Sequence, residues 1–404
     1  MDIRNILQLL NENSKPHILS PNLEVMSLRQ FLDSEHQDID ESLFNEESPS
    51  FLGAKTEELS DEQLKAYLDR ILGKKKEKSD KYNLPYIHSG NVPIVDENGK
   101  EYDLDKLRDQ IKERPKKILK QNEKMQHSDG TSTIYFNVGL PALRGLAVNE
   151  NNGDFIVVNT CPQAGQCKLY CYAMKGGYVQ WKNSSMAQTR LLNFLVNDPD
   201  GFMRELDKEI TEAEKKYNKK KTKVAIRWHD AGDFFSPEYL NSAYSLAKKH
   251  PNTDFYAYTK IASVAHSAKP ENFKINFSMG SQPSQEKQID YSQTKNSRVV
   301  PKELFSDLVY HHKTPTGKTD KKGKEVFDSE LRYKDKQSIK ALKDRIAAKY
   351  SMDPKTILTY DEMMKTPEKK ITDPKKMYNV IVKPGEGDDS ANRGDVLSTL
   401  LLIH

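Results

Sequence analysis

Residues 155–173 read Phe-Ile-Val-Val-Asn-Thr-Cys-Pro-Gln-Ala-Gly-Gln-Cys-Lys-Leu-Tyr-Cys-Tyr-Ala, and they contain every cysteine of the chain. The apolar, β-branched run 155–159 predicts a short buried strand. Cys161, Cys167 and Cys171 follow within eleven positions, in the loop that leaves this strand. Because α/β proteins carry their chemistry in such loops, this stretch predicts both the fold class and the place of the functional site.

Strand and helix patterns alternate on both sides of this stretch, from residue 133 to residue 300. Such alternation predicts a parallel sheet, and the number of repeats favours an α/β fold with a partial or complete (β/α) barrel-like core. The strongest helix start is Ser236-Pro237-Glu238, which offers a cap, a proline at the first helical position and an acid in the first turn. The expected strands cover 134–138, 155–159, 224–228, 254–258, 274–278 and 297–300, and the expected helices cover 184–196, 199–219 and 236–249.

The remaining segments differ from this core in composition. The N-terminal part combines an acidic, aromatic-poor stretch with short helical patterns, so it predicts a helical and flexible appendage. A lysine-rich stretch at 314–324 predicts a mobile loop, and residues 334–349 predict a basic amphipathic helix that is solvated or lies on nucleic acid. The predicted organisation is an appendage at 1–130, a core at 131–301, a basic insertion at 302–376 and a return to the core at 377–404.

The composition limits the class of protein. Of 404 residues, 36% are hydrophobic and 30% are charged, and the formal net charge is only +4. Such a balance gives no argument for nucleic-acid binding from overall charge. We find no apolar run near the ~20 residues that a membrane span needs, and no signal-peptide pattern at the start. An odd number of cysteines argues against a disulfide framework, so we expect a protein of the cytoplasm without membrane association.

The spacing of the cysteines is C-x5-C-x3-C, which is neither the C-x2-C pair of a zinc ribbon nor a redox dithiol. Three thiolates directed at one point suit an iron–sulfur cluster. A 4Fe-4S cluster with three protein ligands leaves one iron free, which is how S-adenosylmethionine is bound for radical chemistry. Two other interpretations stay open: a structural zinc completed by a histidine, and three buried thiols without a chemical role.

Further candidate residues follow the other predicted strands, where ligands bind in parallel α/β sheets. His229 is a candidate for proton transfer or for a fourth metal ligand, and Lys260 for binding an acidic group or acting as a base. Asp233 could accept hydrogen bonds from a cofactor or cap the next helix, and Lys260 could instead pair with Asp230 or Asp233. The predicted cofactor-binding residues in these loops are Gly232, Asp233, Ser278, Gly280 and Ser281.

These motifs resemble those of two groups of known proteins. Thr160–Ala173, Ile226–Ser236, Phe255–Lys260, Phe277–Ser281 and the C-terminal tail together resemble the "gene product 88" domain family of bacteriophages and related mobile elements. Tyr170, directly before Cys171, resembles the aromatic residue that radical S-adenosylmethionine enzymes carry before their last cluster cysteine, although their usual spacing is C-x3-C-x2-C.

These resemblances imply an iron–sulfur protein, a radical S-adenosylmethionine-like enzyme that abstracts hydrogen from an unknown substrate. Tyr170 would then belong to the cofactor site, and an electron donor would be needed. The substrate classes left open are a nucleotide, a nucleic acid, a peptide and a small metabolite, and a phage-encoded protein would work in the host cytoplasm. The alternative is a zinc- or cluster-stabilised binding module without enzymatic activity, with nucleic acid among its partners.

Overall fold

The computed structural model describes residues 56–58, 64, 103–121, 133–169, 171, 173, 182–319, 323–387 and 389–402 of the chain. Most of the predicted N-terminal appendage lies outside the described residues, as does Tyr170. The described part of the appendage contains strand β1 (Thr56–Glu58) and helix α4 (Leu104–Lys112). None of the helices within the described ranges is both long and apolar enough to cross a membrane.

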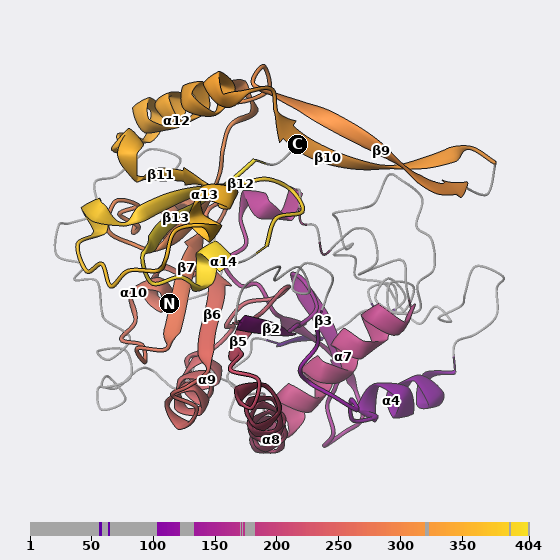
Figure 1. Cartoon of the computed structure of the whole chain (residues 1–404). Helices are drawn as coiled ribbons and strands as arrows, with labels where there is room; N and C mark the ends of the chain where they lie inside the picture. The colour runs from indigo at the N-terminus through magenta and orange to yellow at the C-terminus, as the bar shows by residue number, and fades with distance from the viewer. Residues whose placement is uncertain are drawn as a thin grey trace, which may run out of the picture.

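The core is one sheet of eight parallel strands, so the predicted α/β class is confirmed (Figure 1). Within the described residues no pairing joins its two edge strands, β11 and β2, so the sheet is open and the complete barrel is not formed. Its order is β11 (Ile357–Thr359), β12 (Tyr378–Val382), β13 (Val396–Leu401), β8 (Asn296–Val299), β7 (Phe273–Ser278), β6 (Asp254–Thr259), β5 (Lys223–Trp228) and β2 (Thr133–Val138).

The helices begin where the sequence supplies caps. Asp198 accepts from the backbone N–H of Gly201 at the start of α8, and Ser236 accepts from Tyr239 at the start of α9, as its motif predicts. Pro at the first helical position supports both starts. The described helices are α7 (Lys182–Asn197), α8 (Pro199–Asn218), α9 (Pro237–Lys249), α10 (Ala262–His266), α11 (Pro283–Glu286), α12 (Lys336–Tyr350), α13 (Tyr360–Met364) and α14 (Asp389–Asn392).

The two faces of the sheet differ in chemistry, because side chains alternate across each strand. One face is apolar and forms the main core with α7, α8 and α9; it includes Trp228, Phe255 and Phe273. The opposite face lies under α14 and is largely polar. On strands β2, β5, β6 and β7 its side chains include Tyr135, Asn137, Ala225, Arg227, Asp254, Tyr256, Tyr258, Lys274, Asn276 and Ser278.

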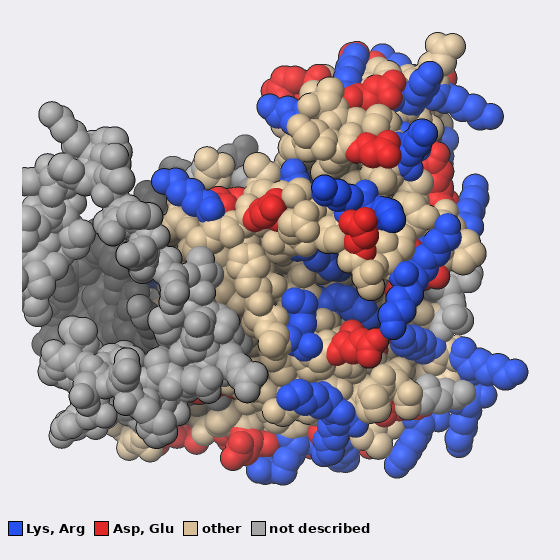
Figure 2. Space-filling model, turned by 90° about the vertical axis from the view of Figure 1, so that its left-hand side faces the viewer, with Lys and Arg blue, Asp and Glu red and all other residues tan. Residues whose placement is uncertain are grey.

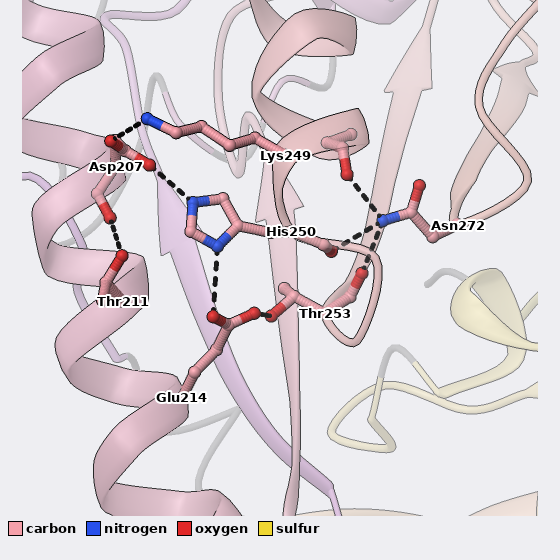
Figure 3. Close-up of polar contacts among 8 residues, drawn as sticks. Asp207, Thr211, Glu214, Lys249, His250, Thr253 and Asn272 are labelled. Atoms are coloured by element: carbon pink, nitrogen blue, oxygen red, sulfur yellow. Dashed lines mark hydrogen bonds and ion pairs between the residues drawn. The ribbon is translucent and has the colours of Figure 1, made fainter.

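A histidine joins α8 to the end of α9 (Figure 3). His250, 5% exposed, bonds Asp207 through Nε2 at 2.8 Å and Glu214 through Nδ1 at 3.1 Å. Both ring nitrogens face carboxylate oxygens of α8, so the ring links two acids of that helix to the end of α9. Glu214 also accepts from Thr253 at 2.6 Å. We conclude that this cluster, here called the His250 clamp, fixes the helix layer against the sheet.

The strand before the cysteines joins a second sheet. β4 (Phe155–Asn159) pairs antiparallel with β1 and with β3 (Arg144–Val148), a strand that the sequence did not predict. The expectation that 155–159 belongs to the parallel core is therefore wrong. Its boundaries are right, but an apolar run does not specify which partner it pairs with.

The predicted mobile loop at 314–324 is also wrong for most of its length. Strands β9 (Val309–Thr319) and β10 (Glu325–Tyr333) pair antiparallel as a two-stranded ribbon, which extends away from the body in Figure 1. The predicted basic helix is present as α12, where Lys343 pairs with Glu362 and Arg345 with Asp307. In Figure 2 Lys and Arg are interspersed with Asp and Glu over the upper part of the molecule.

Candidate functional site

The first cysteine is fixed by the loop between β2 and β3. The N–H of Cys161 donates to the carbonyl of Leu143 at 3.2 Å, and the N–H of Leu143 donates back to Sγ of Cys161 at 3.2 Å. The hydroxyl of Thr160 donates to the carbonyl of Pro141 at 2.6 Å. Leu143 adopts a positive φ of 64°, which turns its N–H toward the sulfur. The start of the cysteine loop therefore has a defined position.

The second cysteine is held against the loop that follows β7. The N–H groups of Gly165 and Cys167 both donate to the carbonyl of Gly280, at 3.1 and 3.0 Å. Cys167 lies in a short 3-10 helix, η3 (Gln166–Leu169). A Cβ at Gly165 would lie 2.0 Å from the carbonyl oxygen of Ser281, so only glycine permits this approach. The predicted residues Gly280 and Ser281 thus lie beside the cysteine loop.

Asp233 connects three of the loops. Its N–H donates to the carbonyl of Thr160 at 2.7 Å, and its carboxylate accepts from the N–H groups of Phe234 and Lys260, each at 2.7 Å. Burial raises the pKa of Asp233 to about 6, against these hydrogen bonds, which favour the charged form. Ser236, not Asp233, caps α9. Asp233 therefore positions loops.

The ammonium group of Lys260 lies at the centre of these loops. Its Nζ donates to Oγ and the carbonyl of Ser278 at 2.8 and 2.9 Å, and to the carbonyl of Met279 at 2.5 Å. Burial lowers the pKa of Lys260, opposed by the nearby Cys167 thiol and the Asp233 carboxylate. Its contact with Asp233 is through the backbone N–H, so the predicted side-chain ion pair is not what holds it. Lys260 and Ser278 are thus brought together with the cysteines.

Glu286 organises the loop after β7, and sequence reasoning missed it. Its Oε1 accepts from the N–H groups of Gly280 and Ser281 at 2.7 and 3.0 Å, and from the Ser281 hydroxyl at 3.1 Å. Its other oxygen accepts from the hydroxyl of Tyr291. The available signal was an acid in the first turn of a helix that begins at Pro283. Because Glu286 already bonds Ser281, that hydroxyl is engaged inside the protein.

The three thiols lie close enough together to affect the pKa of Cys161. Burial, together with the carboxylate of Asp233, raises the pKa of Cys161 to about 12, and the thiols of Cys171 and Cys167 add to this. Burial also raises the pKa of Cys167, opposed by the ammonium of Lys260. Cys171 lies against small side chains, Ala142, Ala173 and Ala231. The three predicted ligands therefore lie in one region of the molecule.

The donor set suits a thiophilic metal centre. Three clustered soft donors, one of them accepting a backbone N–H, have the chemistry of iron–sulfur ligands. Across the described ranges, no three His, Cys, Asp or Glu side chains are already arranged to hold a metal ion. The residue types therefore fit such a group, and their sulfurs would have to turn toward a common centre to bind it.

His229 has different surroundings from Lys260. It is 2% exposed, adopts a positive φ of 62°, and lies among the rings of Trp228, Phe234 and Tyr239. Its Nε2 bonds the hydroxyl of Tyr239 at 2.8 Å, and burial lowers the pKa of His229 to about 3. The structure places this ring, neutral at pH 7, in the apolar layer. Gly232, with φ of 93°, lies against Leu140, where a Cβ would be 2.9 Å from that side chain.

The polar face of the sheet continues to this site. Asn276 and Ser278 lie on the same face of β7, and Ser278 bonds Lys260. Asn137 and Asn276 are 4% and 1% exposed, yet their Oδ1 atoms have no hydrogen-bond partner among the described residues. Buried acceptors are nearly always paired, so water or a ligand is the expected partner. Asn276 bonds Ala391 of α14, so a buried polar face runs from beneath α14 along β7 to Ser278 and Lys260.

Comparison with known proteins identifies the family. The sequence model described as Gene product 88 matches residues 111–339, which is more than half of the chain and includes the parallel strands β2, β5, β6, β7 and β8 as well as all three cysteines. The chain belongs to the Gene product 88 family. The resemblance seen in the sequence is thereby confirmed at the level of the family.

Relatives in two bacteriophages support this assignment. The "Gene 88 protein" of Mycobacterium phage L5 and that of Mycobacterium phage D29 are each 27% identical to this chain over 157 residues. Each match covers 37% of this chain and spans 59% of the relative's length. No solved structure matches the chain. Neither relative's name states an activity, so iron–sulfur and S-adenosylmethionine chemistry stay predictions.

Proposed function

We propose that this member of the Gene product 88 family is an iron–sulfur enzyme in which Cys161, Cys167 and Cys171 hold a 4Fe-4S cluster. One observation carries the proposal: the three thiols lie with Asp233 and Lys260 where loops from four strands meet. Ligand sites of parallel α/β sheets lie at this carboxyl edge. Sulfur ligands select iron–sulfur clusters or zinc over harder ions.

The chemistry of such a cluster is the cofactor's, and the protein supplies binding and orientation. With one iron left free, it would bind S-adenosylmethionine and supply the electron that cleaves it, which starts hydrogen abstraction from a substrate. Asp233 holds the cysteine loop and the Lys260 backbone in a fixed relation. Lys260 presents a positive charge beside Cys167, which favours its thiolate form.

The polar face of the sheet is the proposed substrate side of the site. The oxygens of Asn137 and Asn276 are buried and have no partner among the described residues, so they would accept hydrogen bonds from N–H or O–H groups of a substrate that enters beneath α14. Ser278 lies between this surface and Lys260, so a bound substrate would be adjacent to the cysteine loop. In this proposal Lys260 faces the substrate and His229 supports the apolar layer.

Anaerobic purification followed by iron and sulfide analysis tests the cluster. We expect iron and acid-labile sulfide near four of each per chain, as a 4Fe-4S cluster requires, with a brown absorbance. Cys161→Ser, Cys167→Ser and Cys171→Ser should each lose colour and iron, because the chain has three cysteines in all. Ser284→Ala, at an exposed position of the neighbouring helix α11, is the matched control and should keep both.

The reaction class is tested separately. Reduction of the reconstituted protein with S-adenosylmethionine should release 5′-deoxyadenosine, and Lys260→Met should reduce this release while the cluster is retained. Stoichiometric zinc without sulfide, and no response to S-adenosylmethionine, would overturn the enzyme proposal and favour a zinc-stabilised binding module. A cluster without 5′-deoxyadenosine release would overturn only the radical chemistry.

A further inference from the structure

Four buried acceptor oxygens lie between the sheet and helix α14, which packs on β6, β7 and β13 (Figure 1). They are the Oδ1 atoms of Asn137, Asn276, Asp389 and Asn392, here called the α14 acceptor cluster. These residues are 4%, 1%, 7% and 8% exposed, and none of the four oxygens has a hydrogen-bond partner among the described residues. Buried acceptors are nearly always paired, so the cluster requires donors that these residues do not supply.

Contacts between α14 and the sheet bring members of the cluster together. The Nδ2 of Asn276, on β7, donates to the carbonyl of Ala391 in α14 at 3.2 Å. The hydroxyl of Tyr135, on β2, lies beside Asp389 and Asn392 at the two ends of that helix. Burial raises the pKa of Tyr135, and the carboxylate of Asp389 raises it further. The unpaired oxygens therefore border one region beneath α14.

The protein fixes the orientation of two of the amides. The Nδ2 of Asn276 donates to the carbonyls of Ala257 and Ala391, each at 3.2 Å. The Nδ2 of Asn392 is directed at the carboxylate of Asp254 at 3.4 Å. Turning either amide over would place its oxygen against another oxygen, so both Oδ1 atoms stay acceptors. A ligand of this cluster must therefore bring hydrogen-bond donors.

Asp389 gives the cluster a negative charge. One of its oxygens accepts from a tyrosine hydroxyl of α13, and the other has no partner among the described residues. The cations of the same face of the sheet are engaged elsewhere: Lys274 bonds Asp254 at 2.9 Å, and the guanidinium of Arg227 lies over the ring of Tyr258 at 4.9 Å. A buried carboxylate is stabilised by a nearby cation, so the missing donor is best supplied by a positively charged group.

The extent of the cluster indicates the shape of the ligand. Asn137 lies on β2 and Asn276 on β7, with β5 and β6 between them. Three steps of about 4.8 Å separate these strands by roughly 14 Å. Oxygens that share one hard metal ion each lie about 2.0–2.6 Å from it, and therefore within roughly 5 Å of one another. A single metal ion cannot satisfy the whole cluster, whereas an elongated molecule with several N–H groups can.

We propose that the α14 acceptor cluster binds a small, elongated organic cation, an amine or a guanidine, with its positive charge beside Asp389. Anions such as phosphates and carboxylates do not fit, because they would bring acceptors to acceptors. The identification of this cation as the substrate rests on the proposed function. Its binding does not require the iron–sulfur cluster, so the two ideas can fail separately.

Isothermal titration calorimetry of the full chain with agmatine, which carries an amine and a guanidinium group, tests the proposal. Agmatine should bind, and succinate, a dianion, should not. Asp389→Asn keeps an acceptor for the tyrosine hydroxyl but removes the charge, and it should weaken agmatine binding by about 30-fold or more. Asn137→Ala removes one acceptor and should weaken binding by about 5-fold.

The matched control is Asp361→Asn, which removes an exposed carboxylate of α13 and should bind agmatine as wild type does. Absence of agmatine binding, or equal losses in Asp361→Asn and Asp389→Asn, would overturn the proposal. So would neutral adenosine binding more tightly than agmatine and without loss in Asp389→Asn. Agmatine binding to protein that holds no iron would support this inference alone, and iron and sulfide without agmatine binding would overturn it alone.

Discussion

The two faces of the eight-stranded sheet are built for different purposes. The face toward α8 and α9 is lined with packed aromatic rings, such as Phe255 stacked on Phe273 with centroids 5.8 Å apart. The face toward α14 carries asparagines, tyrosines and a lysine, and some of its buried acceptors have no partner in the part of the chain that the structure describes. Apolar burial supplies most folding free energy, whereas unpaired polar groups cost stability. Stability should therefore depend on one face and binding on the other.

Phe273→Ala, on the apolar face, should lower the free energy of unfolding more than any other change proposed here. Phe273 is 2% exposed and contacts the rings of Phe255, Tyr244 and Phe234. Its truncation should lower the free energy of unfolding by about 3–5 kcal/mol, as buried aromatic-to-alanine changes do. Urea unfolding followed by circular dichroism measures it. The matched control is Phe327→Ala on the β9–β10 ribbon, where exposure predicts a change of about 0.5 kcal/mol or less; a similar loss in both variants would remove the basis of the contrast.

His250→Gln should lower the free energy of unfolding by an intermediate amount. The His250 clamp connects the helices that cover the apolar face of the sheet. An amide cannot bridge Asp207 and Glu214 as the ring does, so two carboxylates would face each other. We expect a loss of about 2–3 kcal/mol in the same unfolding experiment. His266→Gln, at an exposed histidine of α10, is the control and should stay within about 0.5 kcal/mol of wild type.

The clamp also predicts a pH dependence. Burial acts to raise the pKa of Asp207, but hydrogen bonds from Lys249 and His250 outweigh it and hold the pKa below its ordinary value. A carboxyl group with a depressed folded-state pKa stabilises the fold above its unfolded pKa of about 3.9, and this stabilisation is lost as pH falls through the lower folded value. Wild type should therefore lose more stability than His250→Gln between about pH 5 and pH 2. Parallel pH profiles of the two proteins would refute the role of His250 in this shift.

Asn276→Ala should have the smallest effect on stability. Its Nδ2 donates to the carbonyls of Ala257 and Ala391 at 3.2 Å, while its Oδ1 has no partner within the described part of the chain. Loss of these bonds should cost about 1 kcal/mol by urea unfolding. A cost as large as that of Phe273→Ala would show that the polar face holds the fold after all, and the contrast would fail.

Local patterns predicted most elements of the core. The bounds of β5, β6 and α9 lie within one or two residues of expectation, because apolar periodicity and the cap at Ser236 act within a few residues. The same reasoning failed for β9, where glycines, lysines and a proline indicated a loop at 314–324, and it did not predict β10. A hairpin is held by cross-strand pairing, and that pairing is invisible in the composition of either strand.

Some residues of the candidate site could also be predicted from the sequence, and others could not. The cysteine cluster, Asp233, Lys260 and Ser278 could be selected in advance, because strand ends in α/β proteins carry function. Glu286 could not, since its role depends on the Gly280 and Ser281 N–H groups turning toward it. His229 follows a predicted strand as Lys260 does, yet its positive φ turns the ring into the aromatic layer.

The sequence by itself determined the α/β class, the family and the gathering of all three thiols in one short loop, because these follow from periodicity and from residues adjacent in the chain. Tertiary structure alone decided that β4 leaves the parallel sheet, that the sheet stays open, and that Asp233 joins three loops. Those outcomes depend on hydrogen bonds between residues far apart in sequence, whose partners are selected only when the whole chain packs.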